Sequence, residues 1–322
     1  MQEIIVTANE AGQRFDKLLA KYLNEAPKSF IYKMLRKKNI VLNDKKASGN
    51  EKLSVGDSVK LYLADDTIAK FSKTELVKTN AKLDIIYEDE NVLLINKPVG
   101  MLSQKAEAKD ESLVEHIISY MLSSGQLSED ELRKFKPSIC NRLDRNTSGL
   151  IVAGKSLAGL QKMGELFKDR SLRKFYRCLV VGKVSDKIYI KGYLTKDERT
   201  NKVCILEKET EGALPIETEY EPIWTNGVCT LLEVHLITGR THQIRAHLAS
   251  QSHPIIGDYK YGNRKVNDEY KAKYGLESQL LHAYRMELPE LTGELANISE
   301  KHFVASLPTL FSKILQVEKQ ER

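Results

Sequence analysis

The hydrophobic pattern of this 322-residue chain changes character part-way along, and a chain of this length is too long to form one small core. Residues 15–23 and 30–35 carry apolar side chains at helical spacing, and residues 39–43 and 57–63 alternate as short strands. Residues 64–80 are polar without a clear period, and strands predominate after them. The pattern therefore predicts a small domain at 1–63, a linker at 64–80 and a second domain at 81–322.

The second domain mixes strands and helices without a regular alternation. Two strands are predicted around the Glu-Asp-Glu-Asn turn at 88–91, and further strands at 174–184 and 229–239, with helices at 157–169 and 241–250. A parallel sheet would require strands and helices to alternate regularly. The expected fold class is therefore α+β, with a mixed, largely antiparallel central sheet flanked by helices.

Basic charge is concentrated in the first domain. Between Arg14 and Lys46 there are ten lysines and arginines against three acidic residues, whereas the whole chain has a net charge of +6. Such a concentration favours a polyanionic partner, because each phosphate that is neutralised releases condensed counterions. A lysine-rich face that contacts only solvent has the same composition, so charge alone leaves both interpretations open.

Several classes of function are disfavoured by the composition. No apolar run is long enough for a membrane span, and the start, MQEIIVTANE, lacks the features of a signal peptide, so a cytoplasmic location is expected. The four cysteines are far apart and are expected to be reduced thiols. No G-x-G-x-x-G or Walker sequence occurs, and His242 and His247 are five residues apart, off a common helix face, so neither a cofactor nor a metal is expected.

One carboxylate attracts attention, Asp144 in the segment CNRLDRNTSGL at 140–150. Leu143 before it and the apolar run after it indicate that the segment enters the core, where an aspartate is partly desolvated. A nearby arginine would keep such a carboxylate ionised and orient it, as a nucleophile requires. An aspartate that only pairs with Arg142 or caps the loop fits this motif equally well.

Two further segments contain residues suited to chemistry. Arg240 ends a predicted strand and precedes a helix, where an arginine can bind a carboxylate or a phosphate through two hydrogen bonds. Tyr176 shares one face of a predicted strand with Cys178 and Val180, and a tyrosine at the edge of a site can stack on a flipped base. Taken singly, a surface arginine and a core tyrosine explain these residues equally well.

Six blocks in order between residues 81 and 310 together resemble the RluA/RluD type of RNA pseudouridine synthase. They are NKPVG at 96–100, RLDRNTSGL at 142–150, K-x-Y-x-C-x-V-x-G at 174–182, TGRTHQIRAHL at 238–248, HPIIGDYKYG at 253–262 and LLHAYRMEL at 280–288. The resemblance implies an isomerase that converts uridine in RNA to pseudouridine on a flipped-out nucleotide, without a cofactor.

The same resemblance assigns roles to individual residues. The nucleophilic aspartate falls on Asp144, the tyrosine that lies against the target base on Tyr176, and the arginine that pairs with the aspartate on Arg240. An apolar residue that closes the pocket and two arginines near the RNA fall on Leu281, Arg142 and Arg145.

The first domain resembles the RNA-binding domain first named for ribosomal protein S-four, over residues 13–63. It departs from that family at Lys38-Asn39, where a glycine is usual and where Asn is the non-glycine residue that best tolerates a left-handed turn. The two domains together imply large-subunit (23S) ribosomal RNA as the partner of a monomer with no obligatory protein partner. In that family the second helix faces RNA, which places Lys33, Arg36 and Lys37 at phosphates.

Two departures from the synthase family lie where RNA is expected to approach. Asn141 stands where histidine is common, and the segment MLSQK at 101–105 differs from the usual sequence, so the choice of target uridine stays open. A synthase acting on tRNA and a non-catalytic RNA-binding or ribosome-assembly factor remain alternatives, although the presence of Asp144 and Tyr176 disfavours the latter. Because uracil leaves as a stabilised anion, one carboxylate suffices, whether it attacks C1′, adds to C6 or removes a 2′ proton.

Overall fold

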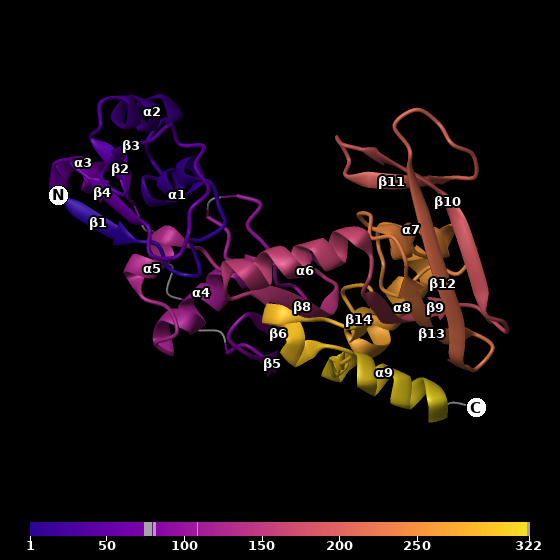
Figure 1. Cartoon of the computed structure of the whole chain (residues 1–322). Helices are drawn as coiled ribbons and strands as arrows, with labels where there is room; N and C mark the ends of the chain where they lie inside the picture. The colour runs from indigo at the N-terminus through magenta and orange to yellow at the C-terminus, as the bar shows by residue number, and fades with distance from the viewer. Residues whose placement is uncertain (74–78, 80–81, 108, 321–322) are drawn as a thin grey trace.

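The computed structural model describes residues 1–73, 79, 82–107 and 109–320. The N-terminal domain is a four-stranded antiparallel sheet with helices packed against it, at one end of the molecule in Figure 1. Its elements are β1 (Gln2–Ile5), α1 (Phe15–Tyr22), α2 (Lys28–Arg36), β2 (Ile40–Leu42), β3 (Lys45–Lys46), β4 (Ser58–Leu61) and α3 (Asp65–Phe71). The strand order is β1-β4-β2-β3.

The predicted elements of this domain are confirmed. Leu18 of α1, Leu35 of α2 and Val59 of β4 are at most 1% exposed and belong to one core, because the apolar positions of each element share one face. The turn after α2 survives without glycine, but Lys38 rather than Asn39 adopts the left-handed conformation, with φ of 58°.

The prediction of a linker at residues 64–80 is wrong for its first half. Residues 65–71 form α3, whose Ile68 is 1% exposed and belongs to the core of the N-terminal domain. A two-turn helix with two apolar residues against that core, Ile68 and Phe71, gives too short a period to be recognised in the sequence. Residues 74–78 and 80–81 of the predicted linker lie outside the described residues.

The second domain is built around one large sheet, confirming the predicted mixed, largely antiparallel architecture. Its strands are β5 (Ile85–Glu88), β6 (Val92–Lys97), β7 (Ser138–Ile139), β8 (Ser148–Gly154), β9 (Arg173–Val181), β10 (Ile188–Asp197), β11 (Lys202–Leu206), β12 (Leu214–Thr225), β13 (Cys229–Leu236), β14 (Leu281–Glu287) and β15 (His302–Val304). The order is β11-β10-β12-β13-β9-β14-β8-β6-β5, with β15 beside β14 and β7 beside β8. Among the named strands of the described residues, only β14 and β8 pair in parallel.

The parallel contact joins the two halves of this sheet and requires a glycine. Gly149 of β8 has a φ of +111° and pairs with Ala283 of β14. A Cβ atom at residue 149 would lie 2.2 Å from the carbonyl oxygen of Ala283, which no side chain could tolerate. The glycine of the Asn-Thr-Ser-Gly segment therefore brings the Asp144 loop against β14.

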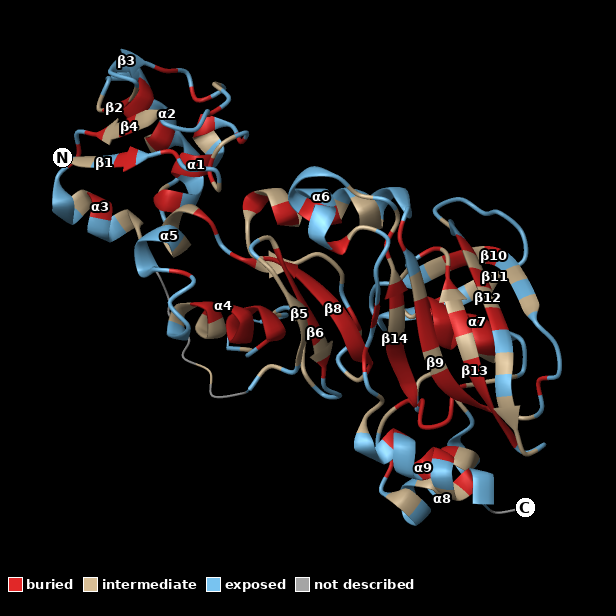
Figure 2. Cartoon of the chain, turned by 60° about the horizontal axis from the view of Figure 1, so that its bottom comes forward, coloured by how far each residue is buried: buried red, intermediate tan, exposed pale blue. Residues whose placement is uncertain are grey.

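Helices cover both faces of the sheet, as the buried surfaces in Figure 2 indicate. They are α4 (Leu113–Ser123), α5 (Glu129–Lys134), α6 (Leu157–Asp169), α7 (Gln243–Ser250), α8 (Arg264–Tyr274), the 3-10 helix η1 (Gly293–Ile298) and α9 (Thr309–Gln320). Ile244 of α7 belongs to the same core as Tyr176 of β9. Ile314 of α9 belongs to a different core, together with Leu179, three residues further along β9. Because side chains alternate along a strand, α7 lies on the Tyr176 face and α9 on the other.

The N-terminal domain contacts the near end of the second domain. The guanidinium carbon of Arg133 in α5 lies 4.4 Å from the ring centre of Tyr22, and the backbone N–H of Leu157 donates to Asn9. In Figure 1 helix α2 and helix α7 lie towards opposite ends of the molecule. A ligand that contacts both helices must therefore be a macromolecule.

Candidate active site

Asp144 lies in the loop between β7 and β8, which hydrogen bonds hold in place. The backbone N–H of Thr147 donates to the Asp144 carbonyl at 3.0 Å. The neighbouring residue, Leu143, is buried, and both its backbone groups bond to the hydroxyl of Ser103, at 2.7 and 3.0 Å. The Asp144 side chain itself remains 29% exposed, so a fixed backbone presents an accessible carboxylate.

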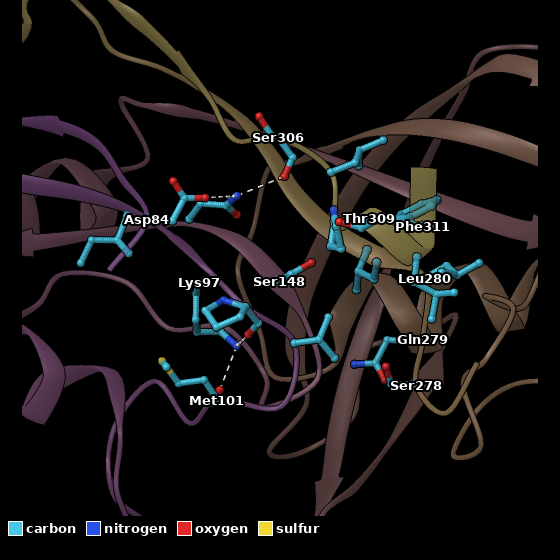
Figure 3. Close-up of a pocket in the computed structure, with 18 of the residues that line it drawn as sticks. Asp84, Lys97, Met101, Ser148, Ser278, Gln279, Leu280, Ser306, Thr309 and Phe311 are labelled. Carbon is cyan, nitrogen blue, oxygen red and sulfur yellow. Dashed lines mark hydrogen bonds between the residues drawn. The ribbon is translucent and has the colours of Figure 1, made fainter. Parts of the chain in front are cut away.

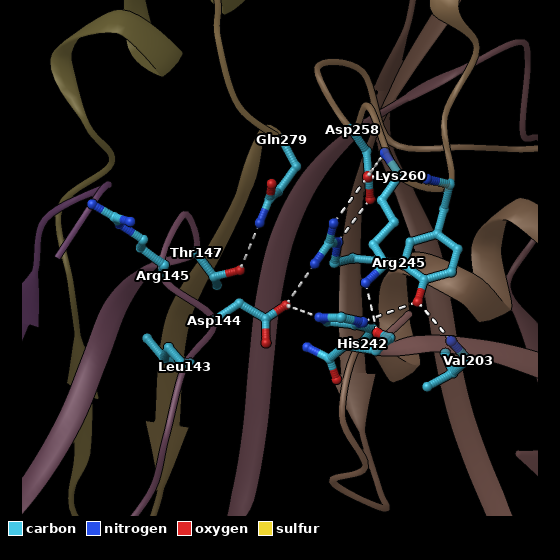
Figure 4. Close-up of polar contacts among 12 residues, drawn as sticks. Leu143, Asp144, Arg145, Thr147, Val203, His242, Arg245, Asp258, Lys260 and Gln279 are labelled. Atoms are coloured by element: carbon cyan, nitrogen blue, oxygen red, sulfur yellow. Dashed lines mark hydrogen bonds and ion pairs between the residues drawn. The ribbon is translucent and has the colours of Figure 1, made fainter. Parts of the chain in front are cut away.

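The guanidinium of Arg245 on α7 holds this carboxylate. Its Nη1 donates to Asp144 Oδ2 at 2.9 Å, and its Nε and Nη2 donate to the two oxygens of Asp258 at 2.7 and 3.0 Å (Figure 4). Burial alone would raise the pKa of Asp258, but the hydrogen bonds and charge of Arg245 hold it below its usual value. Asp258 thus fixes the arginine, and the arginine orients Asp144.

The prediction that Arg240 pairs with Asp144 is wrong, because Arg245 occupies that position. Arg240 lies in the turn before α7, where its backbone N–H donates to Gln243 at 3.0 Å. Its side chain makes no hydrogen bond or ion pair with any described residue, and its Nε is buried. Arg245 lies in the first turn of α7, on the side that faces Asp144.

His242 is a second neighbour of the carboxylate that the sequence did not reveal. Its Nε2 lies 3.8 Å from Asp144 Oδ2, and its Nδ1 lies 2.9 Å from the hydroxyl of Tyr261. That hydroxyl also accepts a bond from the Val203 N–H at 2.9 Å, so Tyr261 ties His242 to β11. Burial lowers the pKa of His242, and its φ of 53° marks a strained backbone that the site maintains.

Together these contacts leave one oxygen of Asp144 available. Arg245 and His242 both approach Oδ2, and no described residue donates a hydrogen bond to Oδ1. A carboxylate that is held on one oxygen and free on the other can approach a reacting atom without losing its orientation.

Tyr176 lies on the central strand β9, opposite Val234 of β13 and Ala283 of β14. It is 8% exposed, and burial, together with the charge of Asp144, raises the pKa of its hydroxyl. The tyrosine therefore stays protonated and is close enough to Asp144 to sense its charge. Its predicted strand face is confirmed, since Cys178 and Val180 share the same core.

A buried lysine connects the NKPVG segment to the Asp144 loop. Lys97 is fully buried, and its Nζ donates to the carbonyls of Pro98, Met101 and Arg145 at 3.0, 2.8 and 3.1 Å. Burial lowers its pKa to about 8, against the opposing influence of Asp144. Only the folded chain places three carbonyl groups around this ammonium, so sequence spacing gave no signal for it.

The remaining predicted residues occupy different surroundings. Arg142 is exposed, and Arg145 points away from Asp144 in Figure 4, with its Nε donating to the Gly100 carbonyl at 3.0 Å. The three predicted cations of the N-terminal domain are exposed, two on α2 and one at the residue that caps its C-terminus. They are Lys33, Arg36 and Lys37.

Both departures from the family pattern turn out to support the loop. The Asn141 side chain accepts from the Val152 N–H at 2.8 Å and donates to the Leu150 carbonyl at 3.2 Å, which fixes the loop to β8. Ser103, within the MLSQK segment, makes the two bonds to Leu143 described above.

A cavity of about 510 Å³ lies beside the site but is separate from it (Figure 3). Leu281 lines it, together with Lys97, Ser148 and Gln279, whereas Asp144 does not. Leu281 of β14 pairs with Cys178 of β9 and is 5% exposed. It therefore lies on the strand face that carries Tyr176 and also lines this cavity.

No three His, Cys, Asp or Glu side chains of the described residues are grouped so that they could hold a metal ion. No helix within the described ranges is long and apolar enough to cross a membrane.

Known proteins are similar to this chain in sequence and in fold. Residues 91–250 match the family model described as RNA pseudouridylate synthase. A protein of Vibrio vulnificus, named ribosomal large subunit pseudouridine synthase C, is 32% identical over 88% of this chain and 87% of its own length. The protein of that name from Escherichia coli K12 is 30% identical over 92% and 91%.

The fold has a solved counterpart as well. The structure of Human RNA Pseudouridylate Synthase Domain Containing 4 aligns with 73% of this chain and 92% of its own, at a TM-score of 0.57 and 24% identity. At that identity the likeness concerns the fold. On the sequence matches, which extend over most of both chains, this chain belongs to the RluA family of RNA pseudouridine synthases, isomerases that act on RNA.

Proposed function

We propose that this enzyme isomerises specific uridines of large-subunit (23S) ribosomal RNA to pseudouridine, with Asp144 as its nucleophile and without a cofactor. The observation that carries the proposal is the Asp144 carboxylate, which Arg245 and His242 hold on Oδ2 while Oδ1 stays free. A nucleophilic carboxylate must be aimed at the reacting atom, and the charge-assisted hydrogen bond from the Arg245 guanidinium orients it.

The chemistry places few demands on the protein. The C1′–N1 bond breaks, the uracil turns, and a C1′–C5 bond forms; C5 gives up its proton to solvent and N1 takes one up. Uracil departs as a stabilised anion, so no second carboxylate is needed to protonate it. One oriented carboxylate and a pocket that retains the detached base are sufficient.

Tyr176 is proposed to lie against the target base. Extruding a base from its stack costs about a few kcal/mol, and stacking on an aromatic ring offsets part of that cost. Because its hydroxyl stays protonated beside Asp144, Tyr176 adds no second negative charge to a site that receives a polyanion.

The substrate is proposed from two observations. The relatives named above are called ribosomal large subunit pseudouridine synthases, and they match this chain along most of its length. The exposed cations of α2 suit the phosphates of a large folded RNA, with Arg142 on the exposed side of the Asp144 loop as a further contact. The proposed enzyme is a monomer that acts on ribosomal RNA in the cytoplasm.

The test uses RNA that carries tritium at C5 of uridine, because formation of the new C1′–C5 bond releases that tritium. Large-subunit RNA, small-subunit RNA and tRNA are each offered to the native enzyme. We expect release from large-subunit RNA, in a small integral number per molecule. Release from tRNA alone would overturn the proposed substrate, and no release from any RNA would overturn the activity.

A further inference from the structure

Lys174 is an unpaired cation on the face of the sheet that carries Tyr176. It precedes Tyr176 by two residues on β9, so the two side chains leave the same face of the strand, about 7 Å apart. It is half-buried, and a Cβ at Gly239 would lie only 3.4 Å from its Nζ. The ammonium therefore lies against the turn that contains Gly239 and Arg240.

No anion within the described residues balances this ammonium. Lys174 makes no hydrogen bond or ion pair with any of them, and burial, then the nearby cation Arg170, lowers its pKa. Most other half-buried cations of this domain have carboxylate partners, such as Lys155 with Glu88 at 2.6 Å. An ammonium placed among backbone and further cations is unfavourable unless an anion arrives.

Arg240 adds a second unsatisfied cation at the same turn. It follows Gly239 directly, its Nε is buried, and that atom has no hydrogen-bond partner among the described residues. A buried donor without a partner costs free energy, and such groups in native proteins often have a role in binding. The family resemblance placed Arg240 at Asp144, but that position belongs to Arg245.

The turn also lies next to the reacting groups. Two residues after Arg240 comes His242, whose Nε2 lies 3.8 Å from Asp144 Oδ2. Tyr176 lies two residues along β9 from Lys174. A uridine whose base rests on Tyr176 and whose ribose meets Asp144 must place a phosphate at the rim of this pocket, because the phosphate is joined to the ribose.

We propose that Lys174 and Arg240 bind one backbone phosphate beside the target uridine, and so hold the flipped nucleotide in register with Asp144. The inference rests on the proposed function and extends it, because it names the part of the substrate that these two cations recognise. A phosphate supplies both the negative charge that Lys174 lacks and the acceptor oxygens that Arg240 lacks.

The test measures RNA affinity at several salt concentrations for the full-length native protein and the variants Lys174→Met and Arg240→Met. Each variant is expected to lower affinity about tenfold, as the loss of a charge-assisted hydrogen bond does, and to flatten the salt slope by about 0.7. Lys174→Arg keeps the charge and should restore most of the affinity. The matched control is Lys265→Met, which removes an exposed lysine of α8 and should change neither quantity.

If Lys174→Met and Arg240→Met keep the slope and affinity of Lys265→Met while remaining folded by circular dichroism, the phosphate site is wrong. This readout does not depend on turnover. A native protein that binds RNA but releases no tritium would overturn the proposed isomerisation, and the salt slopes would still decide whether these cations contact a phosphate.

Discussion

Helices α2 and α7 both carry cations, but in opposite surroundings. Lys33 and Arg36 of α2 and Lys37, its C-terminal cap, are exposed, and no carboxylate among the described residues pairs with any of them. Arg245 of α7 has a side chain that is 9% exposed, between Asp144 and Asp258. Exposed, unpaired cations can bind the phosphates of any nucleic-acid backbone. A cation enclosed by two carboxylates is already neutralised, and its role is to hold Asp144 in position.

The α2 cations are therefore expected to contribute to RNA affinity, and Arg245 to the catalytic step. Interactions of the α2 cations are screened by salt and are shared among many phosphates. The pair between Arg245 and Asp258 is desolvated, so salt hardly weakens it, and removal of one member leaves a buried charge without compensation. Changes in α2 should therefore alter RNA binding, and changes around Arg245 should alter stability and turnover.

The largest effect on stability is expected for Arg245→Met. The substitution leaves Asp258, 1% exposed, without its partner, and such a loss costs about 3–5 kcal/mol in the free energy of unfolding. Urea denaturation measures it. Arg199→Met, at an exposed residue, is the matched control and should change that free energy by less than about 0.5 kcal/mol. Equal losses for the two variants would contradict the assignment of Arg245.

Acid should destabilise the second domain through its buried histidines. Both ring nitrogens of His282 are engaged, by Ser148 and the Ala305 carbonyl, and burial lowers its pKa to about 4; burial lowers that of His247 to about 4 as well. Between the unfolded pKa, about 6.5, and about 4, the unfolded chain binds more protons, so stability falls as pH falls. The loss is about 2 kcal/mol per histidine from pH 7 to pH 5.

One pair of variants tests whether a buried histidine causes the acid sensitivity of the second domain. The N-terminal domain contains none of the seven histidines, so this mechanism cannot act there. His282→Gln should flatten the dependence of the unfolding free energy on pH, whereas His302→Gln, at an exposed residue, should leave it unchanged. An identical pH dependence in the two variants would show that His282 is not a source of the acid sensitivity.

A smaller effect, confined to binding, is expected for the combined change of Lys33, Arg36 and Lys37 to Gln. The slope of log affinity against log salt should fall by about 2, since each phosphate contact contributes about 0.7–0.9. Turnover at saturating RNA should stay within about twofold. A triple change of Arg264, Lys265 and Lys271 on α8 is the control, and a slope equal to that control would count against α2 as an RNA-binding surface.

Much of the fold was predictable from the spacing of apolar residues and from the order of the predicted helices and strands. The apolar faces of α1 and α2 and the Tyr176 face of β9 were read from spacing alone. Helix α3 was missed because it is two turns long, with two apolar residues, Ile68 and Phe71, against the core. The left-handed turn was assigned to Asn39 on propensity, but tertiary contacts placed it at Lys38.

The site was predictable only in part. Asp144 and Tyr176 were singled out by motif, but their partners come from distant segments. Arg240 and Arg245 lie in one block, and only the start of α7 decides which of them reaches Asp144. The lysine within the core, Lys97, has no periodic signature, because its three acceptors are backbone carbonyls that folding brings together.

The most direct test of the account is single-turnover tritium release by Asp144→Asn, with RNA affinity measured on the same sample. Asn keeps an oxygen that can accept from Arg245 but cannot act as an anionic nucleophile. We expect release to fall about 1,000-fold or more, with affinity within about twofold of the native protein. Release at the native rate by this folded variant would contradict the central claim that Asp144 performs the chemistry.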